Sequence, residues 1–250
     1  MRLAEIVRYL DDYLRVREVS DYPDALNGLQ VENAGEVTRI GAAVDLCEAT
    51  VHLAAAQGAD LLLVHHGLFW GGIRPLVGPR RRRIAGLVGH NIALYSAHLP
   101  LDRHPDVGNN ALLARGLGVV LRGEFGEHHG VPTGVWGELT IERAALQERI
   151  AAVLGPVPRL MPFGPATVRL VGIITGAGGS MIADAAAAGL DTYISGEGPH
   201  HTFFDAEELG LNVFYAGHYA TECAGVKALA EHVSARFRIP WVFLDHSTGL

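Results

Sequence analysis

The chain has 250 residues, which is enough for one large domain or for two domains of about 100–150 residues. Apolar residues make up 49% of the sequence and charged residues 19%, a balance that is typical of globular proteins and argues against a disordered chain. No apolar run is long enough to cross a membrane, no signal peptide is recognisable, and there are only two cysteines, so we expect a cytoplasmic protein. The net charge of −7 argues against general nucleic-acid binding.

Hydrophobic patterning predicts alternating helices and strands. Residues 1–17 carry apolar side chains three and four positions apart, which predicts an amphipathic helix. Strands are expected over 40–44, 61–64, 92–95, 168–175, 192–195 and 212–215, and helices near 47–57, 80–89, 180–188, 200–209 and 221–236. Residues 119–141 predict two strands, and residues 142–154 predict a helix. The expected fold class is therefore α/β, with mixed, mainly parallel sheets.

Two halves of the sequence resemble each other. Residues 41–67 align with residues 172–198 without a gap and with seven identical positions. Residues 95–102 then align with residues 215–222, so that each half has a Tyr-x-x-His-x-x-x-carboxylate motif after an expected strand. We infer a duplicated domain. The first α/β repeat is expected over 1–125, with 225–250 as a segment that could complete it, and the second over 126–250.

Histidines and carboxylates follow the expected strands. His65 and His66 lie at the carboxyl end of a strand, where ligand sites gather in parallel α/β sheets. Their rings could face one cleft, serve different metals, or divide into one buried and one solvent-facing histidine. In the second half, His218 and Glu222 share one helix face if the helix includes residue 218, and they also meet if Thr221 is the helix cap. Glu222 could instead serve only the first turn of the helix.

The first-half counterparts are His98 and Asp102, and Pro100 predicts that Asp102 lies on a loop. Imidazoles and carboxylates suit zinc, iron, manganese, nickel or cobalt. These residues together are enough for two ions about 3.5–4 Å apart that share a bridging carboxylate and a bridging hydroxide. That hydroxide would be the nucleophile of a hydrolytic reaction.

Three further features are weaker candidates. The loop Gly176-Ala177-Gly178-Gly179-Ser180 joins a strand to a helix and could cradle a phosphate on its amides. The run Arg80-Arg81-Arg82-Arg83 is typical of a solvated helix start, with a phosphorylated substrate or an acidic partner as the alternative. Glu197 and His201 lie at the strand end equivalent to that of His65-His66, so they are candidates for proton transfer or for orienting ligands.

Four motifs, in order along the chain, resemble the GTP cyclohydrolase I type 2-like family, also called NGG-interacting-factor-three-like proteins. They are Asn27-Gly28-Leu29-Gln30-Val31-Glu32, His65-His66-Gly67-Leu68-Phe69-Trp70, His98-Leu99-Pro100-Leu101-Asp102 with Gly108-Asn109-Asn110, and Gly217-His218-Tyr219-Ala220-Thr221-Glu222. The resemblance covers nearly the whole chain and is thinnest across 119–165. It implies two intertwined, duplicated α/β domains, a dinuclear metal site between them, and toroidal hexamers. The segment between the halves resembles the short form of the family.

The resemblance also implies a ligand set. By motif, the metal ligands are His65, His66, Asp102, His218 and Glu222. The family pattern places His66 and Asp102 on one ion and His65 and His218 on the other, with Glu222 bridging. His98 is not a ligand in that pattern, and it joins Glu197 and His201 as a candidate for catalytic proton transfer.

The expected protein is a homo-oligomer, a hexamer by resemblance, that binds two divalent transition-metal ions (Zn, Fe, Mn, Ni or Co) per chain. It is expected to be a metal-dependent hydrolase of a small molecule. In the reaction that the family name implies, metal-bound hydroxide would attack the guanine imidazole ring carbon of GTP, and formate would be released. A phosphoesterase or amidohydrolase acting on another nucleotide-like or cyclic substrate is a second expectation. The non-enzymatic alternative is a regulatory or metal-storage ring that binds a protein or a nucleic acid.

Overall fold

The structure, a computed structural model, describes residues 1–69, 74–128 and 130–250. Residues 70–73, which include Trp70 of the second motif, and residue 129 lie outside this description. The chain divides into two compact units, one formed by residues 1–107 and 225–246 and the other by residues 108–224 and 247–250. Each unit has helices packed on a mixed sheet, which confirms the α/β fold class. The boundary expected at residue 125 separates the two copies of the duplicated sequence, not the two compact units, and it stays a prediction.

The elements alternate along the chain much as the hydrophobic pattern predicts. The first unit contains α1 (Leu3–Tyr13), β1 (Gly28–Val31), β2 (Ile40–Asp45), α2 (Glu48–Ala56), β3 (Leu61–His66), α3 (Gly78–Gly89), β4 (Ala93–Ser96), α4 (Leu99–Asp102) and β11 (Trp241–Phe243). The second unit contains α5 (Asn109–Leu117), β5 (Val120–His128), β6 (Val131–Glu142), α6 (Arg143–Leu154), β7 (Arg159–Pro162), β8 (Thr167–Ile174), the 3-10 turn η1 (Gly178–Met181), α7 (Ile182–Ala187), β9 (Thr192–Ser195), α8 (Thr202–Leu209) and β10 (Asn212–Tyr215). Helix α9 (His218–Phe237) begins in the second unit and ends in the first.

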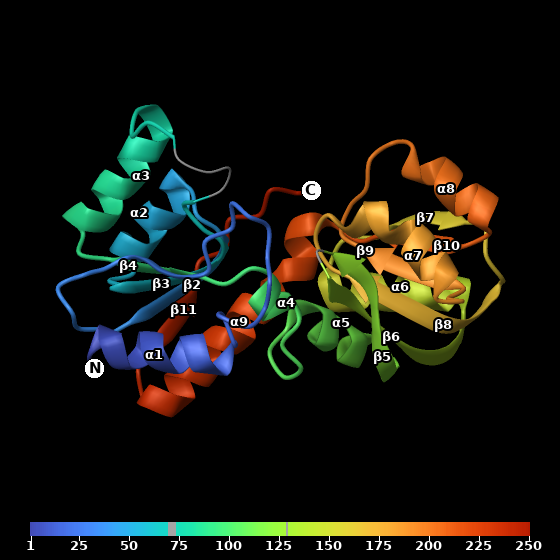
Figure 1. Ribbon diagram of the computed structural model, residues 1–250, viewed down its shortest axis with the longest axis horizontal. Helices are drawn as coiled ribbons and strands as arrows, with labels where there is room; N and C mark the ends of the chain where they lie inside the picture. Colours follow the sequence, from blue (N-terminus) through green and yellow to red (C-terminus); the bar gives the residue numbers. More distant parts are fainter. Residues whose placement is uncertain (70–73, 129) are drawn as a thin grey trace. The chain divides into compact units, whose positions relative to one another are not determined.

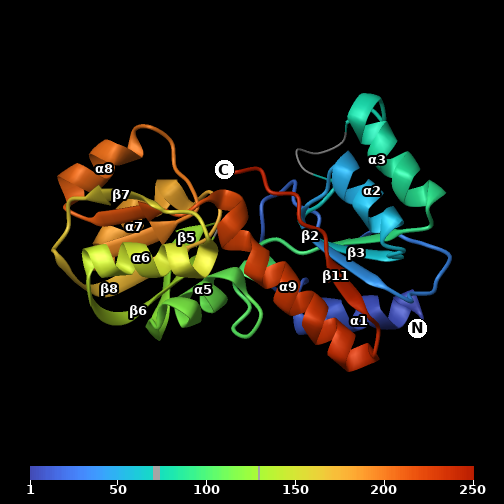
Figure 2. The same ribbon diagram turned by 180° about the vertical axis from the view of Figure 1, so that it is seen from behind.

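The sheet of the first unit has the strand order β1-β4-β3-β2-β11. Strands β4, β3, β2 and β11 are parallel neighbours, and β1 adds an antiparallel edge. Helices α2 and α3 cover one face, and α1 with the later part of α9 covers the other (Figures 1 and 2). Strand β3 is buried on both faces, which explains its unbroken apolar run Leu61–Val64. This run carries the histidine pair to the carboxyl end of the sheet.

The sheet of the second unit has the order β5-β6-β8-β9-β10-β7. Here only β8, β9 and β10 pair in parallel among the described strands, while the β5–β6 hairpin and β7 add antiparallel pairings. Alternate residues enter two cores: Ile194 packs under α5 and α6, and Tyr193 packs under α7 and α8. The period of two therefore sorts side chains to the two faces of the sheet.

The strand ladders support the internal repeat. Ile40 pairs with Leu61 in the first unit, and Val171 pairs with Thr192 in the second, which are the positions that the alignment matches. The pairing with the following strand does not fit the second aligned segment. Val64 and Ser195 are aligned with each other, but Val64 pairs with Ser96 and Ser195 pairs with Tyr215, so Tyr215 corresponds to Ser96 and not to Tyr95. The alignment of His98 with His218 is therefore wrong by one residue. The structural counterpart of His98 is Gly217, so the two histidines are not equivalent.

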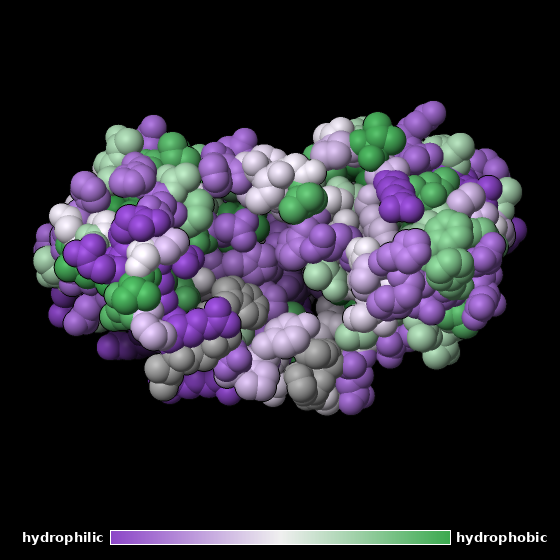
Figure 3. Space-filling view, turned by 90° about the horizontal axis from the view of Figure 1, so that it is seen from above, coloured by the Kyte–Doolittle hydropathy of each residue, from purple (hydrophilic) through white to green (hydrophobic). Residues whose placement is uncertain are grey.

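On the face that Figure 3 shows, apolar and hydrophilic residues are interspersed over each unit. Within the described ranges, no helix combines the length and the apolar character that a bilayer crossing needs.

Candidate metal-binding residues

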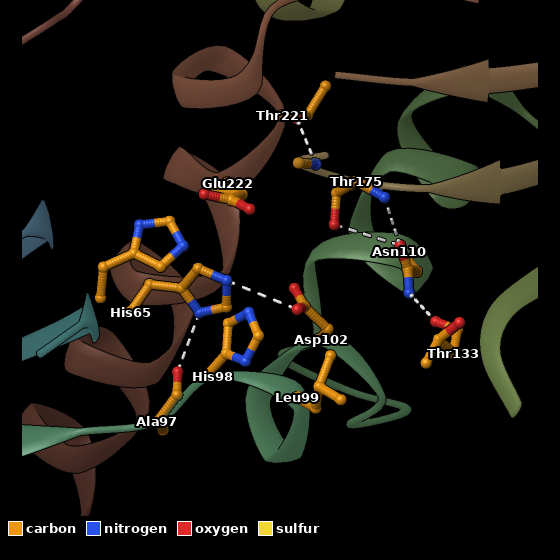
Figure 4. Close-up of polar contacts among 12 residues, drawn as sticks. His65, Ala97, His98, Leu99, Asp102, Asn110, Thr133, Thr175, Thr221 and Glu222 are labelled. Atoms are coloured by element: carbon orange, nitrogen blue, oxygen red, sulfur yellow. Dashed lines mark hydrogen bonds and ion pairs between the residues drawn. The ribbon is translucent and has the colours of Figure 1, made fainter. Parts of the chain in front are cut away.

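His65 is held from both sides of its ring. Its side chain is fully buried, and Nδ1 lies 2.9 Å from the carbonyl oxygen of Ala97, directly after β4. A carbonyl oxygen only accepts hydrogen bonds, so Nδ1 must carry a proton. The other ring nitrogen, Nε2, lies 3.4 Å from a carboxylate oxygen of Asp102 (Figure 4). In the neutral ring, a nitrogen lone pair thus faces an anionic oxygen, an arrangement that a shared cation stabilises.

Two more imidazoles join His65 in the first unit. His66 Nδ1 lies 2.8 Å from Asp45 Oδ1 at the end of β2, and His98 Nδ1 lies 2.8 Å from Asp21 Oδ1. The ligating nitrogens of His65, His66 and His98 all lie within 4.8 Å of one another. Of the alternatives open to the His65-His66 pair, the structure shows the rings together, with centroids 4.7 Å apart.

Asp102 reaches this group from a short helix rather than from a loop. The expectation of a loop is wrong, because Asp102 ends helix α4. Pro100 lies in the first turn of that helix, where a missing N–H costs no hydrogen bond. The Asp102 N–H donates to the carbonyl oxygen of His98, 3.1 Å away, and the turn carries a largely buried carboxylate back toward His65.

The second unit contains a histidine between two carboxylates. Helix α9 begins at His218, so the version of the sequence prediction in which the helix includes this residue is the correct one. His218 Nδ1 lies 2.7 Å from Glu197 Oε1, and Nε2 lies 3.2 Å from Glu222 Oε2. The side chain of Glu222 is 4% exposed. The hydroxyl of Thr221 accepts the N–H of Gly176 at 3.0 Å, which ties the start of α9 to the loop after β8.

Comparisons with known proteins identify the family of the chain. The family model described as Duf34/NIF3 (NGG1p interacting factor 3) matches residues 1–249. The chain belongs to the Duf34/NIF3 family. It is 45% identical over 249 residues to the "GTP cyclohydrolase 1 type 2 homolog" of Deinococcus radiodurans, covering 98% of this chain and 94% of the relative. It is 44% identical over 250 residues to the protein of the same name in Archaeoglobus fulgidus, covering all of both chains. The crystal structure of TTHA1606 from Thermus thermophilus has a TM-score of 0.91 and 44% identity over all of both chains.

In this Duf34/NIF3 protein, the two carboxylates beside His218 make its imidazole unusually basic. The hydrogen bond to Glu222 is the largest cause, and Glu197 adds to it against the opposing effect of burial. Together they raise the pKa of His218 from 6.5 to about 9. A metal ion that bound His218 at neutral pH would therefore displace a proton.

This shift predicts how the stability of the metal-free protein depends on pH. Because the folded pKa of His218 lies above the unfolded one, the stabilisation is fully present below pH 6.5 and is lost as the pH rises through about 9. Thermal or urea unfolding across that range should show a loss on the order of 2 kcal/mol in the native chain that His218→Gln lacks. Parallel pH profiles for the two proteins would contradict this account.

The glycine-rich loop after β8 has a packing role. A Cβ on Gly179 would overlap the Cα of Gly198, and a Cβ on Gly178 would lie 2.6 Å from the hydroxyl oxygen of Tyr193. Both glycines are buried. Close packing therefore accounts for both glycines, and the phosphate-cradle hypothesis stays a prediction.

Gly179→Ala tests this role. The substitution should lower the free energy of unfolding by about 1–3 kcal/mol, because the added methyl meets backbone that has little room to move. The neighbouring Ser180 is exposed, so Ser180→Ala is a matched control that should change stability by less than about 0.5 kcal/mol. Equal stability of the two variants in urea unfolding would contradict the packing role.

The arginine run is partly used in structural contacts. Arg82 forms an ion pair with Glu48 at 2.7 Å, Arg83 donates to the carbonyl oxygen of Leu46 at 3.1 Å, and the Arg80 guanidinium lies 5.5 Å from the Phe69 ring centroid. These contacts fit the interpretation as a solvated helix start.

His201 is exposed just before helix α8, and its imidazole makes no hydrogen bond with the residues that the structure describes. The structure thus places Glu197 beside His218, and His98 beside His65 and His66. His201 has no such contact among the described residues.

Sequence reasoning missed the carboxylates Asp21 and Asp45, which hold His98 and His66. Asp45 could have been found, because it ends the strand beside β3 and pairs with His66 in register. Asp21 gives no such signal, since it lies in an irregular segment far from His98 in sequence. The motif residue Asn110 also has a structural role: it accepts the N–H of Thr175 at 2.9 Å and donates to the carbonyl oxygen of Thr133 at 2.8 Å.

Proposed function

We propose that this Duf34/NIF3 protein binds two divalent transition-metal ions per chain and is a metal-dependent hydrolase. The proposed ligands are His65, His66, Asp102, His218 and Glu222. The name "GTP cyclohydrolase 1 type 2 homolog", carried by relatives at 37–45% identity, supports a hydrolytic reaction on a nucleotide.

One observation carries the metal proposal. In each unit, the candidate histidines turn Nδ1 to an oxygen acceptor: Ala97 O for His65, Asp45 for His66 and Glu197 for His218. Histidines that ligate metals characteristically donate their second N–H in this way, which fixes the ring and leaves Nε2 to the ion. The donor set of imidazoles and carboxylates also fits zinc, iron, manganese, nickel or cobalt.

The residues of the chain have separable tasks in such a reaction. Ions held by these ligands would supply Lewis acidity and lower the pKa of water. Asp45 and Glu197 orient the imidazoles of His66 and His218. His98 is the better placed of the proton-transfer candidates, since its side chain is 12% exposed and close to His65 and His66, whereas His201 is exposed.

The test is a comparison of metal-free and reconstituted protein on two substrate sets. Formate release from GTP tests attack on the guanine ring, and a panel of phosphoesters and cyclic amides tests the second enzymatic expectation. Turnover that depends on added metal and is absent with chelator supports the proposal. No turnover by the metal-loaded protein on either set would favour the non-catalytic alternative.

A homo-hexamer that lies in the cytoplasm stays a prediction. Light scattering coupled to gel filtration would give the mass of the assembly, and a monomer would contradict the expected ring.

A further inference from the structure

Asp21 is a buried carboxylate with four hydrogen-bond donors around it. Oδ1 accepts from His98 Nδ1 at 2.8 Å and from the N–H of Tyr22 at 2.7 Å. Oδ2 accepts from Asn27 Nδ2 at 2.8 Å and from the N–H of Leu99 at 3.1 Å. The side chain is only 5% exposed. A carboxylate that accepts several hydrogen bonds is strongly held in its ionised form, and the bonds to His98 and Asn27 lower the pKa of Asp21 despite burial.

This environment determines which nitrogen of His98 carries the proton. An ionised carboxylate cannot donate, so the contact with Asp21 requires a proton on His98 Nδ1. In the neutral imidazole, Nε2 is then a proton acceptor. The backbone of His98 is fixed as well, because its N–H donates to Asn27 Oδ1 at 2.7 Å. Asn27, the first residue of the Asn27–Glu32 motif, thus binds both members of the Asp21–His98 pair.

The acceptor nitrogen belongs to the imidazole group of the first unit. The ring centroid of His98 lies 5.0 Å from that of His65 and 5.7 Å from that of His66. The ring of Tyr22 packs against His98 with a centroid distance of 5.7 Å. Asp21, Asn27 and Tyr22 together limit rotation of the His98 ring, so that the orientation of its Nε2 is fixed.

We propose that Asp21 is a positioning residue that holds His98 in the Nδ1–H tautomer, and that His98 Nε2 is the proton acceptor in the hydrolysis. This inference rests on the proposed function. As the oxygen of the attacking water bonds to the electrophilic atom of the substrate, one O–H bond of that water breaks and the proton passes to Nε2. The same proton then passes to the leaving group, which restores the neutral imidazole.

Neutron crystallography of the metal-free protein at about pH 9, well above the pKa of an ordinary imidazole, tests the tautomer directly. The proposal expects deuterium on Nδ1 of His98 and none on Nε2. Deuterium on Nε2, with or without deuterium on Nδ1, would overturn it. This measurement needs no variant, so it does not depend on whether an Asp21 substitution folds.

Asp21→Asn tests the role in catalysis, with Asp24→Asn as the matched control in the same segment, where the side chain is exposed. Asp21→Asn should keep the metal content and KM of the native protein while kcat falls by about 10–100-fold. Asp24→Asn should match the native protein in all three. A lower melting temperature of Asp21→Asn with unchanged kcat would reduce Asp21 to a structural role and overturn the proposal. Absence of metal and turnover in the native protein would instead overturn the proposed function, and with it the proton-accepting role of His98.

Discussion

Replacing Glu222 with glutamine should lower the metal content from about two ions per chain to one or none. The carboxylate is almost fully buried and lies 3.2 Å from His218 Nε2, so solvent screens its charge little, and a metal ion that displaced the proton of His218 would be attracted strongly. Glutamine has nearly the same shape but no charge, and the loss in metal affinity should exceed roughly 100-fold, more than is typical of residues behind the ligands. Elemental analysis and metal titration would measure both quantities, and hydrolysis should disappear with the ions.

Glu231→Gln is the control for this substitution. Glu231 lies on the same helix α9 but is exposed. It should keep the metal content of the native protein, because only the net charge changes. If Glu222→Gln bound as much metal as Glu231→Gln, Glu222 would not be a ligand.

Asp102→Asn should remove metal binding without destabilising the metal-free protein. His65 Nδ1 donates to Ala97, so the neutral ring presents a lone pair to Asp102 at 3.4 Å. The amide of asparagine can donate to that lone pair, whereas the carboxylate cannot. We therefore expect the free energy of unfolding of the metal-free variant to equal or exceed that of the native protein, while metal affinity falls by more than about 100-fold.

Asp60→Asn should show the opposite pattern. Asp60 accepts the N–H of Thr38 at 2.8 Å, the hydroxyl of Thr38 at 2.6 Å and the N–H of Arg39 at 3.1 Å, and it is not a proposed ligand. Its replacement should lower the free energy of unfolding by about 1–3 kcal/mol and leave the metal content unchanged. Urea unfolding and elemental analysis of both variants would separate the two roles. A destabilised Asp102→Asn that still bound metal would show that Asp102 is structural.

Many elements of the fold could be predicted because burial leaves a recognisable apolar pattern in their sequence. Strand β3 is a continuous apolar run, and β9 and β10 were expected with the bounds that the structure has. The elements that were not predicted, β1, α5, β7, β11 and the short α4, give weak local signals. Strand β11 has three half-buried residues, and it exists because β2 offers a free edge to Trp241–Phe243. Pairing partners far along the chain decide such edge strands, and local patterning does not contain that information.

The histidines of the candidate site could be predicted because, in each unit, they follow the carboxyl ends of parallel strands. The carboxylates that bind the second ring nitrogen of these histidines could not all be predicted from their place after a strand. Asp21 contacts His98 across 77 positions of sequence, through a segment without regular structure. The internal repeat also misled in one detail, because the sequence alignment matches His98 with His218. The strand pairings show that the two histidines differ by one position.

The most direct test of this account is elemental analysis of the protein purified without chelators and without a metal-affinity column. We predict about two transition-metal ions per chain, or the recovery of that content when zinc, manganese, iron, nickel or cobalt is added to the metal-free protein. That result would also name the element with which to screen substrates. A content near zero that no added metal restores would contradict the account, because the imidazoles and carboxylates would then serve only the fold.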